Sequence, residues 1–329
     1  MPAVAILSMS DIDSKMSDIK YLVKGAIPVA SVGLLWGGSG SFKTALAVDL
    51  ALHISYGLPY LGLKTTKANV LYCAFEGGLG IGNRIKAWHA ARGMDWRQCP
   101  LRVVVDPLAL RTDAGAVVRA LEAAAFIPGL IIGDTLSQTF DSEENSASEV
   151  AAFFRALVAA FVSRWGCTVL MIHHAGHAAT ERPRGSSAIV ANTDFVFGVF
   201  RQEGAMLTTL ECSKQKDGAL LPPIAFRVDI VKVGTDDEGD PITSIVAHHI
   251  ADPKALAESV GAGPDGPKRL ILELAKLGLP VGEARKRFYS ESDADTKAAK
   301  QKQWQRTLAW AEQSGLAQIA DGLLLRTTV

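Results

Sequence analysis

A loop rich in glycine and serine at residues 37–44 constrains the fold of this chain more than any other segment. It reads Gly-Gly-Ser-Gly-Ser-Phe-Lys-Thr and lies between an apolar run at 32–36 and an apolar stretch at 44–55. The short run predicts a buried strand and the longer stretch a helix. Between a strand and a helix, backbone N–H groups and the helix N-terminus bind phosphate, so this segment is typical of a Walker A loop.

The residues of this loop have distinct expected roles. Lys43 would neutralise the β- and γ-phosphates, and the hydroxyl of Thr44 would bind Mg²⁺. Phe42 departs from the pattern, because a second glycine is expected at its position. The alternative interpretation is a turn before a helix whose lysine is incidental. The predicted nucleotide-binding residues are Gly37, Gly38, Ser39, Gly40, Ser41, Phe42, Lys43, Thr44 and Ala45.

Further apolar runs alternate with helical patterns along the first half of the chain. Strands are predicted at 32–36, 69–75, 101–105, 130–134 and 168–172, and helices at 44–55, 83–92 and 149–165. This alternation predicts an α/β fold with a mostly parallel, twisted sheet covered by helices on both faces. After residue 194, strands joined by turns follow at 195–200, 206–213, 224–233 and 243–250. We therefore expect antiparallel strands to extend one edge of the sheet.

Polar residues follow or end three of the predicted strands. Asp134 ends the strand at 130–134, where a Walker B aspartate that helps to hold Mg²⁺ belongs. Glu76 follows the strand at 69–75 and is placed to orient the attacking water as a general base. His174 follows the strand at 168–172 and is a candidate sensor of the γ-phosphate. The alternatives are an aspartate that caps the next segment and a glutamate that only begins a turn.

Three histidines, His173, His174 and His177, also raise the alternative of a metal site. Only the first and last have the spacing of a zinc-binding pair on a helix, and this stretch leaves a strand instead. The spacing therefore argues against a structural or catalytic zinc site here.

The overall composition limits the classes of protein to consider. Hydrophobic residues make up 48% of the 329 residues, and 34 basic residues balance 34 acidic ones, which is typical of a globular protein. No apolar run approaches the roughly 18 residues of a membrane-spanning helix, and the first residues lack a secretory pattern. The four cysteines lie far apart, in or beside apolar runs. We therefore expect a cytoplasmic protein with reduced thiols and no membrane partner.

Two domains joined by a linker are expected. The P-loop ATPase domain is predicted at 1–255, a glycine- and proline-rich linker at 256–267, and a small domain at 268–329. Helices followed by a hairpin-like stretch favour a winged-helix-like structure for the small domain. Its basic stretch around Trp304 suits a DNA contact. An ordinary solvated helix with this tryptophan in the core, or a protein-docking module, remains the alternative.

Taken together, these motifs resemble those of the RepA-like AAA ATPases of plasmids, phages and prophages, which are related to RecA and to bacterial replicative helicases. The resemblance covers about residues 20–235 and rests on the segments 21–25, 40–44, 71–77, 132–136, 144–145, 172–174, 184–188 and 214–218. Members of this group carry Ser-Phe-Lys-Thr in the loop, as here. One departure is His177, where lysine is expected.

The resemblance implies a RecA-like core and a homo-oligomeric ring, expected to be a hexamer, with ATP and Mg²⁺ at each subunit interface. Lys214 and Lys216 would then reach the γ-phosphate bound by the neighbouring subunit. The alternative for these lysines is a solvated hairpin. The polar loop at 175–187 would contact single-stranded DNA. Its candidate DNA-binding residues are Arg182, Arg184 and Ser186.

The function implied is an ATP- and Mg²⁺-dependent helicase that moves along single-stranded DNA in the replication of a plasmid, phage or mobile element. A replication initiator or a primase is then a candidate partner. One alternative is a RecA-like ATP-dependent DNA-binding or remodelling protein that does not unwind DNA. Another is an ATP-switch regulator that binds duplex DNA through the C-terminal domain. A small-molecule kinase is disfavoured, because no lid-like insertion is evident.

Overall fold

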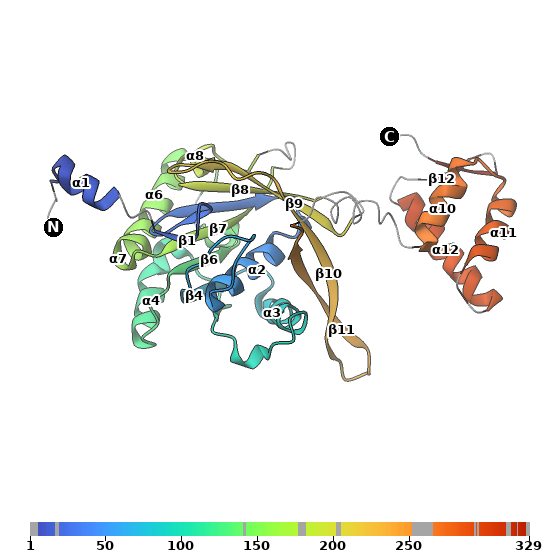
Figure 1. Cartoon of the computed structure of the whole chain (residues 1–329), viewed down its shortest axis with the longest axis horizontal. Coiled ribbons are helices and arrows are strands. Elements are labelled where there is room, and N and C mark those ends of the chain that lie inside the picture. Colours follow the sequence, from blue (N-terminus) through green and yellow to red (C-terminus); the bar gives the residue numbers. More distant parts are fainter. Residues whose placement is uncertain are drawn as a thin grey trace. The chain divides into compact units, whose positions relative to one another are not determined.

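A computed structural model of the chain describes two units (Figure 1). The described residues are 6–16, 20–140, 143–176, 182–201, 205–251, 266–292, 294, 296–313, 317–320 and 322–326. The first unit contains those up to Ala251, apart from Ala205, and the second those from Gly266 onward. Most of the predicted linker, 256–265, lies outside the described residues. Its last two residues begin helix α10 (Gly266–Lys276).

A mixed sheet, with nine strands among the described residues, forms the centre of the first unit. Its order is β11 (Pro241–His249), β10 (Ile224–Thr235), β9 (Leu207–Gln215), β8 (Phe195–Arg201), β3 (Val32–Gly37), β7 (Thr168–His174), β6 (Leu130–Asp134), β4 (Val70–Ala74) and β5 (Arg102–Val104). The strands from β8 to β5 run parallel, whereas β9, β10 and β11 are antiparallel. The predicted α/β fold class is therefore confirmed. The antiparallel extension begins at β9, because β8 pairs parallel with β3.

Helices cover both faces of this sheet. Their bounds are α2 (Lys43–Tyr56), α3 (Ile81–Ala90), α4 (Leu110–Ala123), α5 (Leu136–Thr139), α6 (Ala147–Leu157), α7 (Ser163–Trp165) and α8 (Ala188–Ala191). Shorter elements are η1 (Gly78–Gly80), η2 (Trp96–Gln98) and the π-helical η3 (Val158–Val162), which joins α6 to α7. Helix α1 (Met9–Met16) and the paired strands β1 (Tyr21–Val23) and β2 (Ile27–Pro28) precede the sheet. The helices α2 and α3 lie on one face, and α4 and α6 on the other (Figure 1).

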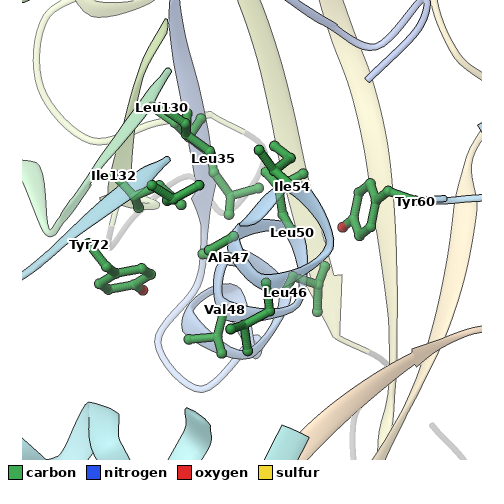
Figure 2. Close-up of a cluster of buried hydrophobic side chains, with 14 of the residues drawn as sticks. Leu35, Leu46, Ala47, Val48, Leu50, Ile54, Tyr60, Tyr72, Leu130 and Ile132 are labelled. Carbon is green, nitrogen blue, oxygen red and sulfur yellow. The ribbon is translucent and has the colours of Figure 1, made fainter. Parts of the chain in front are cut away.

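The side chains of β3 show why this sheet needs two covering layers. Leu34 and Trp36 pack in the cluster that includes α4 and α6, and Leu35 packs in the cluster that includes α2. In Figure 2, Leu50 of α2 lies close to Leu35. Successive residues of a strand point to opposite faces, so a continuously apolar strand is stable only when both faces are covered. This burial fixes the strand that leads into the loop at 37–44.

A buried carboxylate joins the helix after that loop to the next helix. Asp49 of α2 is 2% exposed, and its Oδ1 accepts hydrogen bonds from Trp88 Nε1 at 2.7 Å and from Arg92 Nη2 at 3.0 Å. The guanidinium carbon of Arg92 also lies 4.0 Å from the centroid of the Trp88 ring. A buried charge is tolerated when it is paired and hydrogen-bonded in this way. The contact therefore holds α2 against α3.

The second unit consists of three described helices and a hairpin. Helices α10, α11 (Val281–Glu291) and α12 (Lys297–Gln313) pack with the antiparallel strands β12 (Ala317–Ala320) and β13 (Leu323–Arg326). The core contains Phe288 and Trp304, whose ring centroids lie 5.2 Å apart. Trp304 is thus a core residue, as the interpretation of an ordinary solvated helix predicted. The assignment of this unit as a winged helix stays a prediction.

Two further expectations concern the cell environment. None of the helices in the described part of the chain combines the length and apolarity that a bilayer crossing requires. The four cysteines are unpaired, and Cys73 and Cys167 are buried. Burial raises the pKa of both thiols to about 12, so these two are unreactive side chains of the core.

Candidate functional site

The predicted site residues meet at one edge of the parallel sheet. Ala74, two residues before Glu76, pairs with Asp134, and Asp134 pairs with Ile172 on β7. On the other side of β7, His174 pairs with Gly37, the first residue of the phosphate loop. Because parallel strands have their carboxyl ends at the same edge, this register brings Glu76, Asp134 and His174 beside the loop.

A pocket of about 400 Å³ lies over the phosphate loop. Its lining includes Ser39, Gly40, Ser41, Phe42, Lys43, Thr44 and Ala45, together with Glu76, Asp134 and His174. Gly40 and Phe42 both have left-handed backbones, with φ of 71° and 72°. Phe42 adopts the conformation that a glycine takes more readily, which explains why a glycine is expected there.

The ammonium group of Lys43 lies inside the phosphate loop. Its Nζ donates hydrogen bonds to the carbonyl oxygens of Gly37 at 3.0 Å and Gly38 at 2.7 Å. The side chain is 6% exposed, and this burial lowers the pKa of Lys43, while the carboxylates of Asp134 and Glu76 act in the opposite direction. The carbonyl oxygens of Gly37 and Gly38 thus hold the ammonium group in the loop, where phosphate oxygens would contact it.

Thr44 and Asp134 form the predicted metal-binding pair. Thr44 Oγ1 donates a hydrogen bond to Asp134 Oδ2 at 2.9 Å, and the hydroxyl of buried Tyr72 donates to the same oxygen at 2.8 Å. A hydroxyl and a carboxylate are the hard oxygen ligands that Mg²⁺ prefers. The buried Ser41 Oγ has no hydrogen-bond partner among the described residues and belongs to the loop that lines the pocket. These groups fit a nucleotide with a divalent metal ion.

Glu76 is held by two neighbours beside the pocket. Its Oε2 accepts a hydrogen bond from Thr135 Oγ1 at 3.1 Å and lies 3.2 Å from His174 Nε2. The carboxylate is half exposed, so water reaches it. A carboxylate in this position is able to orient a water molecule toward a terminal phosphate and accept its proton.

The pKa of Asp134 leads to a prediction on pH dependence. Burial raises this pKa, and the hydrogen bonds from Tyr72 and Thr44 lower it in part. Only the carboxylate form binds a metal ion, so metal-dependent nucleotide affinity should be lost on acidification at a higher pH than for an ordinary aspartate. In Tyr72→Phe the midpoint should move to still higher pH. Titrations of a fluorescent ADP analogue with Mg²⁺ at a series of pH values measure both midpoints.

The matching control is the same titration without Mg²⁺, which removes the part of the binding that depends on Asp134. A midpoint at the pH of an ordinary aspartate would contradict the prediction. So would an unchanged midpoint in Tyr72→Phe.

Four residues near the site were not identified from the sequence. Arg84 of α3 and Arg201 at the end of β8 line the pocket, and Tyr72 and Thr135 hydrogen-bond to its carboxylates. Thr135 directly follows Asp134, and Tyr72 lies in the strand that leads to Glu76. Both could therefore have been predicted from their positions at or near the ends of strands. The two arginines carry no local pattern that marks them.

The candidate DNA-binding residues lie on the segment after β7. Arg182 and Arg184 are exposed, and Arg184 Nε lies 3.4 Å from the carboxylate of Glu144. The backbone N–H of Ser186 donates to the Glu144 carbonyl oxygen at 3.0 Å. The acidic loop after β6 therefore contacts the basic loop after β7. Residues 177–181, including His177, lie outside the described residues.

Lys214 and Lys216 make contacts within their own subunit instead of lining the pocket. Lys214 Nζ donates hydrogen bonds to the carbonyl oxygens of Val190 at 2.8 Å and Thr193 at 2.5 Å, near the end of α8. Lys216 Nζ lies 3.2 Å from Asp194 Oδ1. A cation near the C-terminal carbonyls of a helix is favourable. Their action on a neighbouring subunit stays a prediction.

No group of three or more potential metal-binding histidine, cysteine, aspartate or glutamate side chains occurs among the described residues. His173 is buried, and its Nε2 lies 2.9 Å from the carbonyl oxygen of Arg184.

Comparison with known protein families identifies the architecture of this site. A family model described as AAA domain matches residues 2–180, more than half of the chain. The chain belongs to the AAA domain family. Together with the phosphate loop, the strand-end aspartate and Glu76, this makes the protein a P-loop ATPase. The resemblance seen in the sequence is confirmed at this level, and its RepA-specific part stays a prediction.

One of three similar solved structures supports the fold of the core of this AAA ATPase. The ATPase domain of G40P aligns with a TM-score of 0.50 and 13% identity, covering 67% of this chain and 92% of that one. The RadB recombinase aligns with a TM-score of 0.44 and 14% identity, covering 60% and 87%. A KaiC-like protein from Pyrococcus horikoshii OT3 aligns with a TM-score of 0.47 and 13% identity, covering 69% and 93%. No curated protein matches the sequence.

Proposed function

We propose that this AAA ATPase is a RepA-type DNA helicase or translocase that moves along single-stranded DNA in the replication of a plasmid, phage or mobile element. Lys43 and the phosphate loop bind ATP, Thr44 and Asp134 hold Mg²⁺, and Glu76 activates the attacking water. Mg²⁺ would offset the negative charge of the phosphates. His174 senses the γ-phosphate, and the loop at 175–187 contacts DNA.

The observation that carries this proposal is the continuity between the hydrolytic residues and the basic loop. His174 Nε2 lies 3.2 Å from Glu76 Oε2, and the His174 carbonyl oxygen accepts a hydrogen bond from the Arg184 backbone at 2.9 Å. At the base of the same loop, the Ala175 N–H donates to the carbonyl oxygen of Gly37 at 2.9 Å. A shift of His174 on loss of the γ-phosphate would therefore be transmitted directly through the backbone to Arg184.

We further propose that the protein acts as a homo-oligomeric ring, a hexamer, with Lys214 and Lys216 directed to the neighbour's nucleotide. Within its own subunit, Lys214 donates hydrogen bonds to carbonyl oxygens of α8. Lys216 donates one to the carboxylate of Asp194. Transfer to a phosphate in trans would exchange these acceptors for a more highly charged one. A replication initiator or a primase is the further partner that this function implies.

The exposed basic face of α12 favours a second candidate function. Lys302 and Arg306 are exposed and lie one helical turn apart, so they share one face of α12. Such a face suits phosphate contacts along a duplex. The second candidate is an ATP-switch regulator that binds duplex DNA through its C-terminal unit. A RecA-like DNA-binding ATPase without unwinding activity differs from the main proposal only in its motor action.

Steady-state ATP hydrolysis with and without a single-stranded oligonucleotide tests the proposal. We expect strong stimulation by the oligonucleotide in the wild type. Arg184→Gln should weaken apparent DNA affinity and reduce the salt slope by about one, because one phosphate contact is lost. Glu144→Gln should have the opposite effect on affinity, since it removes the carboxylate that competes for Arg184. Arg102→Gln changes an exposed arginine on the edge strand β5 and serves as the matched control.

The outcomes separate the three candidate functions. A rate of ATP hydrolysis that is the same with and without single-stranded DNA would contradict the helicase proposal. Stronger stimulation by duplex, lost when Lys302 and Arg306 are replaced, would favour the regulator. Stimulation by single strands without displacement of an annealed strand would indicate a DNA-binding ATPase that does not unwind.

A further inference from the structure

An arginine at the end of β8, Arg201, contacts the phosphate loop and has none of the hydrolytic roles proposed above. The guanidinium carbon of Arg201 lies 4.4 Å from the centroid of the Phe42 ring, within the range of a cation–π contact. Its Nη1 also donates a hydrogen bond to the carbonyl oxygen of Gly40 at 3.2 Å. Arg201 therefore contacts the loop at both of its left-handed residues.

A second contact comes from β9, the neighbour of β8, and is made to Ser41, the residue between Gly40 and Phe42. Thr208 of β9 is 2% exposed, and its hydroxyl lies 3.2 Å from the carbonyl oxygen of Ser41 and 3.1 Å from that of Phe200. Lys43 Nζ contacts Gly37 and Gly38 within the loop. The loop is thus held by residues of β8 and β9 and by its own lysine.

The left-handed backbone conformation of Phe42 explains why the contact with Arg201 is useful. A φ of 72° is unfavourable for a residue with a side chain, and such conformations persist when surrounding contacts fix them. A glycine would adopt it without this cost but would offer no ring. The phenyl ring provides the surface on which Arg201 stacks, so the unusual residue and the arginine form one structural device.

We propose that Arg201 is a positioning residue that holds the phosphate loop in its nucleotide-binding conformation through the ring of Phe42. The loop's N–H groups must be aligned before phosphate arrives, and misalignment reduces affinity in the ground state and the transition state alike. The proposal therefore predicts a change in nucleotide affinity with little change in kcat. Because Arg201 also lines the pocket, a direct contact with the nucleotide is the competing explanation.

A double-mutant cycle between these two residues distinguishes the explanations. Arg201→Gln is expected to raise the KM for ATP and the Kd of a fluorescent ADP analogue about fivefold, with kcat within about twofold of the wild type. In a Phe42→Gly background, the effect of Arg201→Gln should be clearly smaller, since the ring is gone and only the hydrogen bond to the Gly40 carbonyl oxygen remains to be lost. Phe42→Gly should itself fold, because glycine adopts this φ freely.

The matched control is Arg97→Gln. Arg97 also stacks on an exposed aromatic ring, with its guanidinium carbon 4.8 Å from the Trp96 centroid, but it lies outside the pocket. This variant should leave KM and Kd unchanged. Arg201→Lys, which keeps the charge and a donor, should restore part of the affinity. A full-size effect of Arg201→Gln in the Phe42→Gly background would overturn the proposal. So would a loss confined to kcat, or no effect in the wild-type background.

Discussion

Replacement of Lys43 by alanine should lower the kcat for ATP hydrolysis by about 10²- to 10³-fold, the size expected when one preorganised electrostatic contact to the reacting group is removed. The same change should weaken nucleotide binding strongly, because it removes a buried positive charge that contacts the backbone of the phosphate loop. Steady-state kinetics and titration with a fluorescent ADP analogue measure the two effects separately.

Lys64→Ala is the control for this variant, because Lys64 is exposed and does not line the pocket. It should hydrolyse ATP at the wild-type rate. A Lys43→Ala protein that binds nucleotide with unchanged affinity would contradict the role assigned to the loop. Circular dichroism should show both variants folded, since the alanine removes a buried charge and leaves the apolar face of α2 intact.

Glu76→Gln should lower kcat by about 10²- to 10⁴-fold, the usual contribution of a general base, while nucleotide affinity stays close to that of the wild type. The amide keeps the shape of the side chain and an oxygen that accepts from Thr135, but it cannot take a proton from water. The variant should therefore bind ATP and fail to turn it over. Single-turnover hydrolysis with a parallel binding titration provides the measurement.

Asp106→Asn is the matched control for Glu76→Gln. Asp106 is an exposed carboxylate that follows β5, the strand next to β4, but it does not line the pocket. Its loss should leave hydrolysis unchanged. If Glu76→Gln retained the wild-type rate, another group would have to activate the water, and the assignment of Glu76 would be wrong.

Strand ends predicted most of this site because of a property of parallel sheets. Each of Glu76, Asp134 and His174 was found where an apolar run stops, and parallel pairing places such stops at one edge. The phosphate loop fixed which edge this would be. Local sequence was therefore sufficient for residues whose position depends on strand direction alone.

Residues that reach the site from elsewhere were beyond this kind of argument. Arg84 comes from the helix after η1, and Arg201 from a strand far along the chain whose parallel pairing with β3 was not predicted. Helix α4 was also missed. Its Gly115, Val117 and Val118 have low helix propensity, which weakens the local helical signal.

The environment of a charged side chain was equally hidden in the sequence. The sequence predicts Lys214 to be an exposed lysine on a hairpin, yet its ammonium group donates hydrogen bonds to carbonyl oxygens near the end of α8. Arg184 reads as an available basic residue, yet it pairs with Glu144. In both cases the partner is distant in sequence, and the pairing depends on how two loops meet.

The buried contact of Asp49 has a consequence for how the protein opens. Asp49 lies in the helix whose first residues are Lys43 and Thr44, and its partners Trp88 and Arg92 lie in and just after α3. Separating the two helices would take the carboxylate in this apolar layer away from both partners and leave it only the contact with His53 of α2, which is costly. Amide protons of α2 and α3 should therefore exchange with solvent in a single cooperative event, and a ligand on the first turn of α2 should slow exchange in both helices.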